Sequence, residues 1–283
     1  MSELLRLDSL RKVFPVRTSA GEPAGELVAV DDVSFALPPG GSLAVVGESG
    51  SGKTTVARMV AGLEASTSGR IILDGDPVEA SRAGRGARKT RARQVQMVFQ
   101  DPYTSLDPKQ TIQAAIEELL RAHFPWDADR RRERVAQLLD QVGLDKRQGG
   151  ARPRALSGGQ RQRAAIARAL ALEPRLLILD EAVAALDVSV QAQIINLLAD
   201  LRTETGVAYL FISHDLGVVR QISDDCVVMH RGRVVEEGRT AAVLDDPQDP
   251  YTQRLLSAVP RPGWVPRRRA DAQHASAPQE AGG

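Results

Sequence analysis

The chain has 283 residues, 42% of them hydrophobic, which is enough to bury the core of one large or two small domains. Its 37 lysines and arginines almost balance its 36 acidic residues, so no global field drives it onto nucleic acid or anionic lipid. One cysteine excludes a disulfide framework, and no apolar stretch approaches the roughly 18 residues of a membrane span. No apolar N-terminal segment with a cleavage site is present, so the composition predicts a soluble protein of a reducing compartment.

Short apolar runs and helical spacing alternate along most of the chain. Strands are predicted at Ser42–Val46, Val95–Phe99, Leu176–Leu179 and Val207–Ile212, and helices at Lys53–Ala61 and Gln191–Arg202. Strands separated by helices of this length favour an α/β sheet with crossover helices. Between Thr111 and Val142 the apolar residues follow helical spacing alone, which predicts a helical insertion within the α/β core.

The strongest local motif lies between the first strand and its following helix, where the sequence GESGSGKT fits G-x-x-x-x-G-K-[ST]. Glycines let successive N–H groups point at phosphate oxygens, and the helix start adds its positive dipole end. The motif predicts that Lys53 contacts the β- and γ-phosphates and that the Thr54 hydroxyl is a ligand of Mg²⁺. The expected nucleotide-binding residues are Gly47, Glu48, Ser49, Gly50, Ser51, Gly52, Lys53, Thr54 and Thr55.

An acidic pair follows the strand at Leu176–Leu179. Since α/β sheets place ligands at the carboxyl ends of their strands, Asp180 is expected in the Mg²⁺ shell. Glu181 is the candidate to orient or deprotonate the attacking water, and a positioned base typically contributes ~10²–10⁴ in rate. The alternative is an acidic strand end or helix start without a chemical role.

A second glycine-rich helix start, with the sequence LSGGQ, lies at Leu156–Gln160. Ser157 is placed as the N-cap of a helix predicted to continue to Leu170, and such a helix start can itself bind an anion. Two such sites about 110 residues apart in one chain suggest that the second serves another nucleotide.

Together these motifs resemble those of the ATP-binding subunits of ABC transporters, from about Leu4 to about Pro262. The resemblance implies an α/β P-loop NTPase core with an antiparallel β edge subdomain and an inserted helical subdomain. It also implies that two ATPase subunits enclose two ATP molecules, each site being completed by the partner's signature sequence. The signature residues expected to act on the partner's ATP are Ser157, Gly158, Gly159 and Gln160.

The resemblance also gives roles to residues outside these motifs. Gln100 matches the glutamine that reaches Mg²⁺ and the attacking water, and His214 matches the switch histidine at the γ-phosphate. Asp187 lies in the loop that couples the two sites, and Phe14 sits where an aromatic ring stacks on adenine. The alternatives are a capping or surface role for His214 and a core role for Phe14. Cys226 is expected to be buried and inert.

The chain departs from the family pattern directly after the acidic pair. Ala182 stands where members usually have proline, and Ala184 replaces a common serine. Neither change removes a metal ligand or the base, so we expect a competent site whose turn is looser and whose rate can be lower.

Two segments resemble dipeptide and oligopeptide importers in particular. One is Gln100–Pro108 (QDPYTSLDP), and the other is the C-terminal extension, where the usual His-Pro-Tyr is Asp249-Pro250-Tyr251. Nickel importers share both features, so the resemblance leaves the cargo open. The predicted domains are a nucleotide-binding domain over 1–245, with its helical insertion at about 101–157, and an extension over 246–283. The Pro-, Gly- and Ala-rich end of that extension, Asp271–Gly283, is expected to be disordered.

The function implied is an ATP-binding and ATP-hydrolysing subunit that powers import of di- or oligopeptides, peripheral on the cytoplasmic face of the inner membrane. The expected partners are a second ABC ATPase subunit in a heterodimer, two permease subunits and an extracytoplasmic solute-binding protein, with no nucleic acid. The alternatives are import of nickel or another small solute, a non-transport ABC ATPase on nucleic acid or ribosomes, and a solitary kinase or GTPase. The basic segment Arg82–Arg93 is the best support for a nucleic-acid role, and we interpret it instead as a solvated edge.

Overall fold

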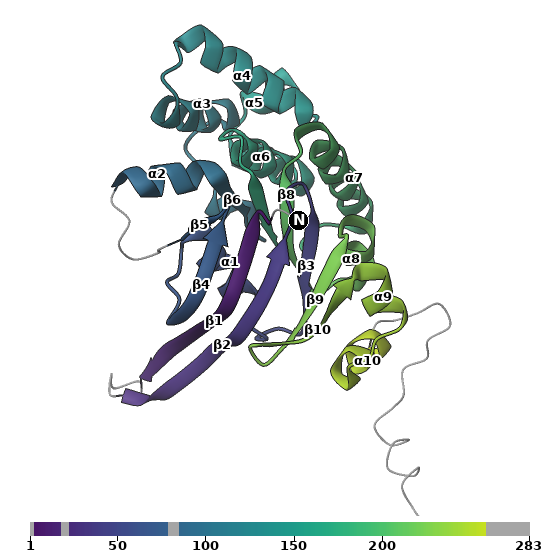
Figure 1. Cartoon of the computed structure of the whole chain (residues 1–283). Helices are drawn as coiled ribbons and strands as arrows, with labels where there is room; N and C mark the ends of the chain where they lie inside the picture. The colour runs from purple at the N-terminus through teal and green to yellow at the C-terminus, as the bar shows by residue number, and fades with distance from the viewer. Residues whose placement is uncertain (1–2, 18–22, 79–84, 259–283) are drawn as a thin grey trace, which may run out of the picture.

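The computed structural model describes residues 3–17, 23–78 and 85–258, with the backbone alone at 17, 23–24 and 85–88. A six-stranded sheet in the order β10-β9-β3-β8-β7-β6 forms its centre (Figure 1). Its strands are β3 (Ser42–Val46), β6 (Val95–Val98), β7 (Leu176–Asp180), β8 (Ala208–Ser213), β9 (Asp225–His230) and β10 (Arg233–Arg239). All neighbours pair in parallel except β10, which joins β9 as an antiparallel edge.

A second, four-stranded antiparallel sheet has the order β2-β1-β4-β5. Its strands are β1 (Leu5–Arg17), β2 (Pro23–Leu37), β4 (Ser68–Leu73) and β5 (Asp76–Pro77). The long β1–β2 pair runs as the purple ribbon across the front of Figure 1. The antiparallel edge subdomain that the family resemblance implied is therefore present.

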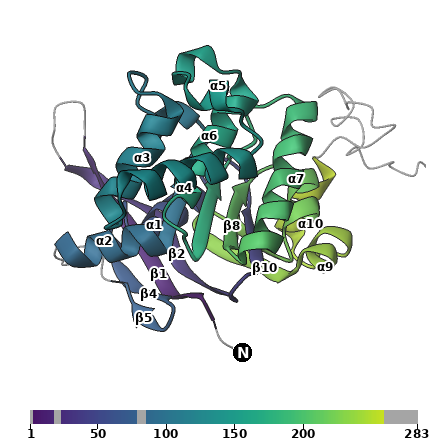
Figure 2. The same ribbon diagram turned by 90° about the horizontal axis from the view of Figure 1, so that it is seen from above.

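Helices connect the strands, and several of them lie in the long segment of chain between β6 and β7. The described helices are α1 (Lys53–Ala61), α2 (Arg85–Gln94), α3 (Ile112–His123), α4 (Ala128–Gln141), α5 (Lys146–Gly149), α6 (Gly158–Leu170), α7 (Val188–Thr205), α8 (Leu216–Ile222), α9 (Thr240–Asp245) and α10 (Pro250–Ser257). Viewed from above, α3, α4 and α5 gather together beside α6 (Figure 2). None of the helices within the described part of the chain is long and apolar enough to cross a membrane.

The apolar core lies on both faces of the central sheet because successive strand residues point to opposite sides. Val46, Leu177 and Phe211 belong to the cluster that the helices α3, α4, α6 and α7 complete. Val45 and Ile178 belong to the other cluster, which contains α1 and the inner side of the antiparallel sheet. The continuous apolar runs of the sequence are therefore strands buried on both faces, as predicted.

The basic segment predicted as a solvated edge forms most of α2, and the prediction is wrong for Arg91. Its guanidinium is partly buried and donates to the main-chain oxygens of Met59 and Val60. Arg82 and the predicted disordered end Asp271–Gly283 lie outside the described residues. Cys226 is buried as expected, and burial raises the pKa of its thiol to about 12.

Candidate nucleotide-binding site

The carboxyl ends of four parallel strands meet at one edge of the central sheet. Val46 pairs with Ser213, and Asp180 pairs with Ile212, so the residues that follow β3, β7 and β8 emerge side by side. Val98 of β6 pairs with Leu179 of β7, which brings the segment leading to Gln100 to the same edge. This is the edge at which open α/β sheets bind ligands.

The loop between β3 and α1 requires its glycines. Gly47 and Gly52 have φ of 148° and 102°, values that side chains rarely allow. A Cβ at Gly47 would lie 2.2 Å from the main-chain oxygen of Met229, and one at Gly52 would lie 2.4 Å from that of Ala29. The loop therefore curls closely against neighbouring backbone, and it ends where α1 begins.

Lys53, the first residue of α1, is only 5% exposed, and its ammonium lies on the phosphate loop. Its Nζ donates to the main-chain oxygens of Gly47 at 2.8 Å and of Glu48 at 2.7 Å. Burial lowers the pKa of this ammonium, and the charges of Glu181, Asp180 and Glu48 oppose that shift. Phosphate oxygens would be stronger, charged acceptors for the same donor.

Thr54 and Asp180 meet directly below the loop. The Thr54 hydroxyl donates to Oδ1 of Asp180 at 3.1 Å, and the carboxylate is 7% exposed at the end of β7. Burial raises the pKa of Asp180, whereas the hydrogen bond from Thr54 lowers it. A hydroxyl and a carboxylate beside a phosphate-binding loop fit the oxygen preference of Mg²⁺, which usually takes one or two carboxylates together with substrate phosphates.

Glu181 is held at a sharp turn after β7. Its φ of 49° is unusual for a residue with a side chain, and its N–H donates to the main-chain oxygen of Ile212 at 2.9 Å. Its Oε1 lies 3.3 Å from Nδ1 of His214, so the candidate base and the candidate switch residue face each other. Ala184 closes the turn by donating to the Glu181 oxygen at 3.0 Å, although proline is absent at Ala182.

The signature residues lie at the start of α6, where Ser157 and Gln160 form a reciprocal capping box. A Cβ at Gly159 would lie 2.5 Å from Cγ1 of Val190, so α6 packs closely on α7. Asp187 caps α7 by accepting from the Val190 N–H at 2.9 Å, and its hydrogen bonds lower the pKa of this carboxyl. The signature residues thus lie beside α7, and the contacts described for them do not reach this chain's own phosphate loop.

Gln100 is exposed just after β6 and lines a hollow of about 370 Å³. The same hollow includes Gly158 of the signature helix and Leu186 of the coupling loop, so three predicted elements share one surface. Phe14 lies apart on β1 and is half-buried, with the Lys12 ammonium 4.6 Å from its ring centroid. A half-exposed ring suits the stacking role that the resemblance implied.

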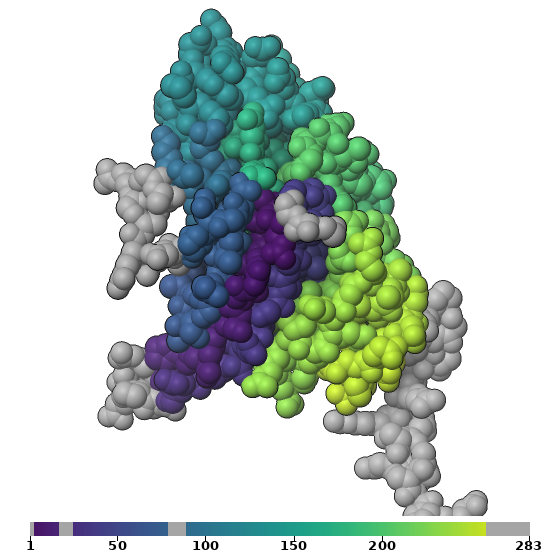
Figure 3. Space-filling view, viewed as in Figure 1, coloured from purple at the N-terminus to yellow at the C-terminus, as the bar shows by residue number. Residues whose placement is uncertain are grey.

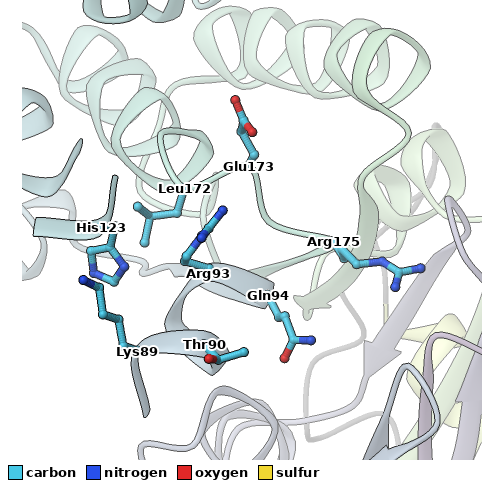
Figure 4. Close-up of a pocket in the computed structure, with 8 residues that line it drawn as sticks. All are labelled: Lys89, Thr90, Arg93, Gln94, His123, Leu172, Glu173 and Arg175. Carbon is cyan, nitrogen blue, oxygen red and sulfur yellow. The ribbon is translucent and has the colours of Figure 1, made fainter. Parts of the chain in front are cut away.

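A second hollow of about 470 Å³ shares no residue with the phosphate loop (Figure 4). It is lined by Lys89, Thr90, Arg93, Gln94, His123, Leu172, Glu173 and Arg175. Several of its charges are already in structural contacts: Arg175 pairs with Asp74, and the Arg93 guanidinium lies 4.5 Å from the Phe124 ring centroid. We therefore place the candidate site at the strand ends rather than in this hollow.

Two protein-family models match this chain. Residues 30–184 match the model described as ABC transporter. Residues 235–282 match the model described as the C-terminal region of oligopeptide/dipeptide transporters. The two matched regions contain the phosphate loop, Gln100, the signature sequence and the acidic pair, whereas Phe14, Asp187 and His214 lie outside them.

Curated relatives include the glutathione import ATP-binding protein GsiA of Salmonella paratyphi A (strain ATCC 9150 / SARB42) and of Escherichia coli (strain K12). Each is 48% identical over 258 residues, which are 91% of this chain and 41% of the relative. The chain thus spans about two-fifths of the length of these relatives.

Solved structures show the same fold. The ATP-binding cassette MJ0796, described as a dimer in a post-hydrolysis state bound to ADP and Pi, is 27% identical with a TM-score of 0.73, covering 83% of this chain and 98% of that one. The cbiO1 protein of Clostridium perfringens, described as part of the ABC transporter complex cbiONQ, is 27% identical with a TM-score of 0.74, covering 87% and 92%.

Proposed function

Because the chain belongs to the ABC transporter family, we propose that it binds and hydrolyses ATP to power import of a solute through separate membrane subunits. The observation that carries this proposal is the contact between Thr54 and Asp180 beneath the phosphate loop, with Glu181 and His214 paired beside it. An ATP phosphate chain, a metal and an attacking water each find suitable side chains at this edge of the sheet.

Phosphate binding would fall to the loop N–H groups and to Lys53, which already sits over the loop with its ammonium desolvated. Thr54 and Asp180 would hold Mg²⁺, with Gln100 as a further oxygen ligand from the next strand. Bound Mg²⁺ would neutralise negative charge that develops on the transferred phosphoryl group. Phe14 would stack on the adenine from the antiparallel sheet.

Water activation would fall to Glu181. Its backbone is fixed by the bond to Ile212, so the carboxylate is positioned before any nucleotide arrives. The carboxylate would accept a proton from the attacking water, and His214, 3.3 Å away, would orient it and contact the γ-phosphate. Ser157, Gly159 and Gln160 would act on the nucleotide of a second ATPase subunit, since they lie beside α7 rather than their own phosphate loop.

Di- or oligopeptides are the cargo class that the comparisons favour. The match of residues 235–282 to the oligopeptide/dipeptide transporter region supports it, as does similarity to a glutathione importer, because glutathione is a small peptide. The complex would contain a second ABC ATPase, two permeases and an extracytoplasmic solute-binding protein. The chain would then act on the cytoplasmic face of the inner membrane.

The test is ATP hydrolysis by the assembled complex carrying Glu181→Gln or Lys53→Ala. We expect Glu181→Gln to lose about 10²-fold or more in turnover while it keeps ATP binding, since only the base is removed. Lys53→Ala should lose both turnover and ATP binding. The matched control is Glu133→Gln, an exposed residue of α4, which should keep full turnover. Turnover near the wild-type rate in Glu181→Gln would contradict the assignment of the base.

A further inference from the structure

The C-terminal extension touches the phosphate loop. Tyr251 of α10 is 6% exposed, and its hydroxyl accepts a hydrogen bond from the Glu48 N–H at 3.1 Å. Glu48 is the second residue of the phosphate loop, 203 positions away in sequence. The short helix α10 lies beside β10 in both ribbon views, and the space-filling view shows the two C-terminal helices packed against the body of the protein (Figures 1–3).

Further contacts hold the Tyr251 ring and the start of α10 in place. Its ring lies on the His230 ring, with centroids 3.9 Å apart and planes tilted by 40°. Its N–H donates to Oδ1 of Asp249 at 2.7 Å, which caps α10. The Glu236 carboxylate of β10 accepts from the N–H groups of Gln248 at 2.8 Å and Asp249 at 3.2 Å. The start of α10 is therefore tied to β10 as well as to the end of β9.

The same region of the β9–β10 turn also supports the loop. The Gly232 N–H donates to the Ser51 oxygen at 3.0 Å. On Glu48 itself, the main-chain oxygen accepts from Lys53 while the N–H donates to Tyr251. One residue of the loop is thus held at its amide by the C-terminal helix and at its carbonyl by the phosphate-binding lysine.

We propose that Tyr251 is a positioning residue for the phosphate loop, through which the C-terminal extension sets the loop's affinity for nucleotide. The inference rests on the proposed nucleotide binding of that loop. The Glu48 N–H carries one hydrogen. While this hydrogen is bonded to Tyr251, the first turn of the loop is held in one orientation. A loop fixed in its binding conformation loses less conformational entropy when it binds, which raises affinity.

The test is nucleotide binding by the full-length Tyr251→Phe variant, which removes only the hydroxyl. A neutral hydrogen bond contributes about 0.5–1.5 kcal/mol net, so we expect the Kd for ATP to rise about 3- to 10-fold. In the assembled complex KM should rise by the same factor while kcat at saturating ATP stays within about twofold, because Tyr251 does not touch the reacting atoms.

Tyr209→Phe is the matched control. Tyr209 is also buried, and its hydroxyl donates to the main-chain oxygen of Leu198 at 2.7 Å, away from the loop. It should lose comparable stability without a change in Kd. A second readout is amide hydrogen exchange at Glu48, which should become faster in Tyr251→Phe and stay unchanged in Tyr209→Phe.

The outcomes separate this inference from the proposed function. Equal Kd values for wild type and Tyr251→Phe would overturn the inference, and so would an equal loss of affinity in both tyrosine variants. If the wild-type chain itself fails to bind ATP, the proposed function fails. The positioning contact would then be judged by Glu48 exchange alone, and unchanged exchange in Tyr251→Phe would overturn it.

Discussion

At the level of single residues, the site holds two ionisable side chains in conditions that disfavour their charges. Burial lowers the pKa of Lys53 and raises that of Asp180, although each is near groups that oppose the shift. Glu181, which follows Asp180, has a backbone with a positive φ. Strain and desolvation of this kind gather at functional sites, where a ligand rather than the fold supplies the compensating contacts.

Asp180→Asn should therefore stabilise the nucleotide-free protein at neutral pH while it abolishes hydrolysis. A carboxyl whose pKa is higher in the folded chain than in the unfolded one favours folding at low pH, and that contribution is lost as the pH rises through the folded pKa. Asparagine does not titrate and can still accept from Thr54. In thermal melts between about pH 4 and 8, the variant's Tm should exceed that of the wild type at the upper end and approach it at the lower end.

Asp200→Asn, an exposed residue of α7, is the control and should leave Tm unchanged over this range. A lower Tm for Asp180→Asn than for wild type at neutral pH would show that the ionised carboxylate stabilises the unliganded fold, contrary to this argument.

The sequence alone predicted the phosphate loop and the acidic pair, because each is a contiguous motif beside a recognisable strand. It could not predict the bond between Tyr251 and Glu48, since that contact joins residues 203 positions apart. In the sequence, Tyr251, Leu255 and Leu256 stand at helical spacing, and the structure places all three in α10, but this spacing does not say what the helix contacts.

At the level of elements, α2 is tied to the phosphate-loop helix by Arg91. Its Nη2 donates to the last-turn oxygens of α1, at 3.0 Å to Met59 and 2.6 Å to Val60. Helix ends leave such oxygens without intrahelical partners, and a cation there also complements the negative end of the helix dipole. Burial lowers the pKa of Arg91 to about 10. Gly62 leaves the room for this contact, because a Cβ there would lie 2.7 Å from Cζ of Arg91.

Arg91→Ala should lower the free energy of unfolding by about 1–3 kcal/mol, the usual effect of removing a charged donor from partly buried acceptors. Urea unfolding would show it as a lower midpoint at constant slope. Arg91→Lys should restore only part of the loss, because an ammonium lacks the planar fork of a guanidinium.

Arg93→Ala on the same helix is the control for this comparison. Its exposed guanidinium contacts only the Phe124 ring among the described contacts, so we expect a loss below about 1 kcal/mol. An Arg91→Ala variant no less stable than Arg93→Ala would contradict a structural role for the contact between α2 and α1.

The two sheets differed in how far the sequence predicted them. Four strands of the central sheet, β3, β6, β7 and β8, are short and mostly buried, and the structure confirms them within one or two residues at their ends. The antiparallel sheet was expected only from the family resemblance. Its β1–β2 pair has register shifts near Leu10 and Lys12, and Ser9 has a positive φ. These irregularities interrupt the alternation of buried and exposed residues by which a strand is recognised in a sequence.

At the level of the whole molecule, the near-neutral net charge of +1 reflects local pairing as well as overall balance. Arg175 pairs with Asp74, Arg134 with Glu173 at 3.5 Å, and Arg202 with Asp224. The helix that carries the basic segment directs Arg91 into the fold. On the described surface, many arginines thus have acidic or main-chain partners instead of forming an unopposed basic stripe.

This distribution of charge argues against nucleic-acid binding, and the proposed function instead predicts binding to membrane subunits. A nucleic-acid protein neutralises phosphates with free cations, so its affinity falls steeply with salt. We expect no salt-sensitive binding to duplex DNA or single-stranded RNA in fluorescence anisotropy between about 50 and 200 mM salt. Co-expression with the permeases of its transporter should instead recover a stable complex. Tight nucleic-acid binding that weakens with salt, together with failure to co-purify with permeases, would favour the non-transport alternative, because the phosphate loop and signature sequence serve both kinds of ABC ATPase.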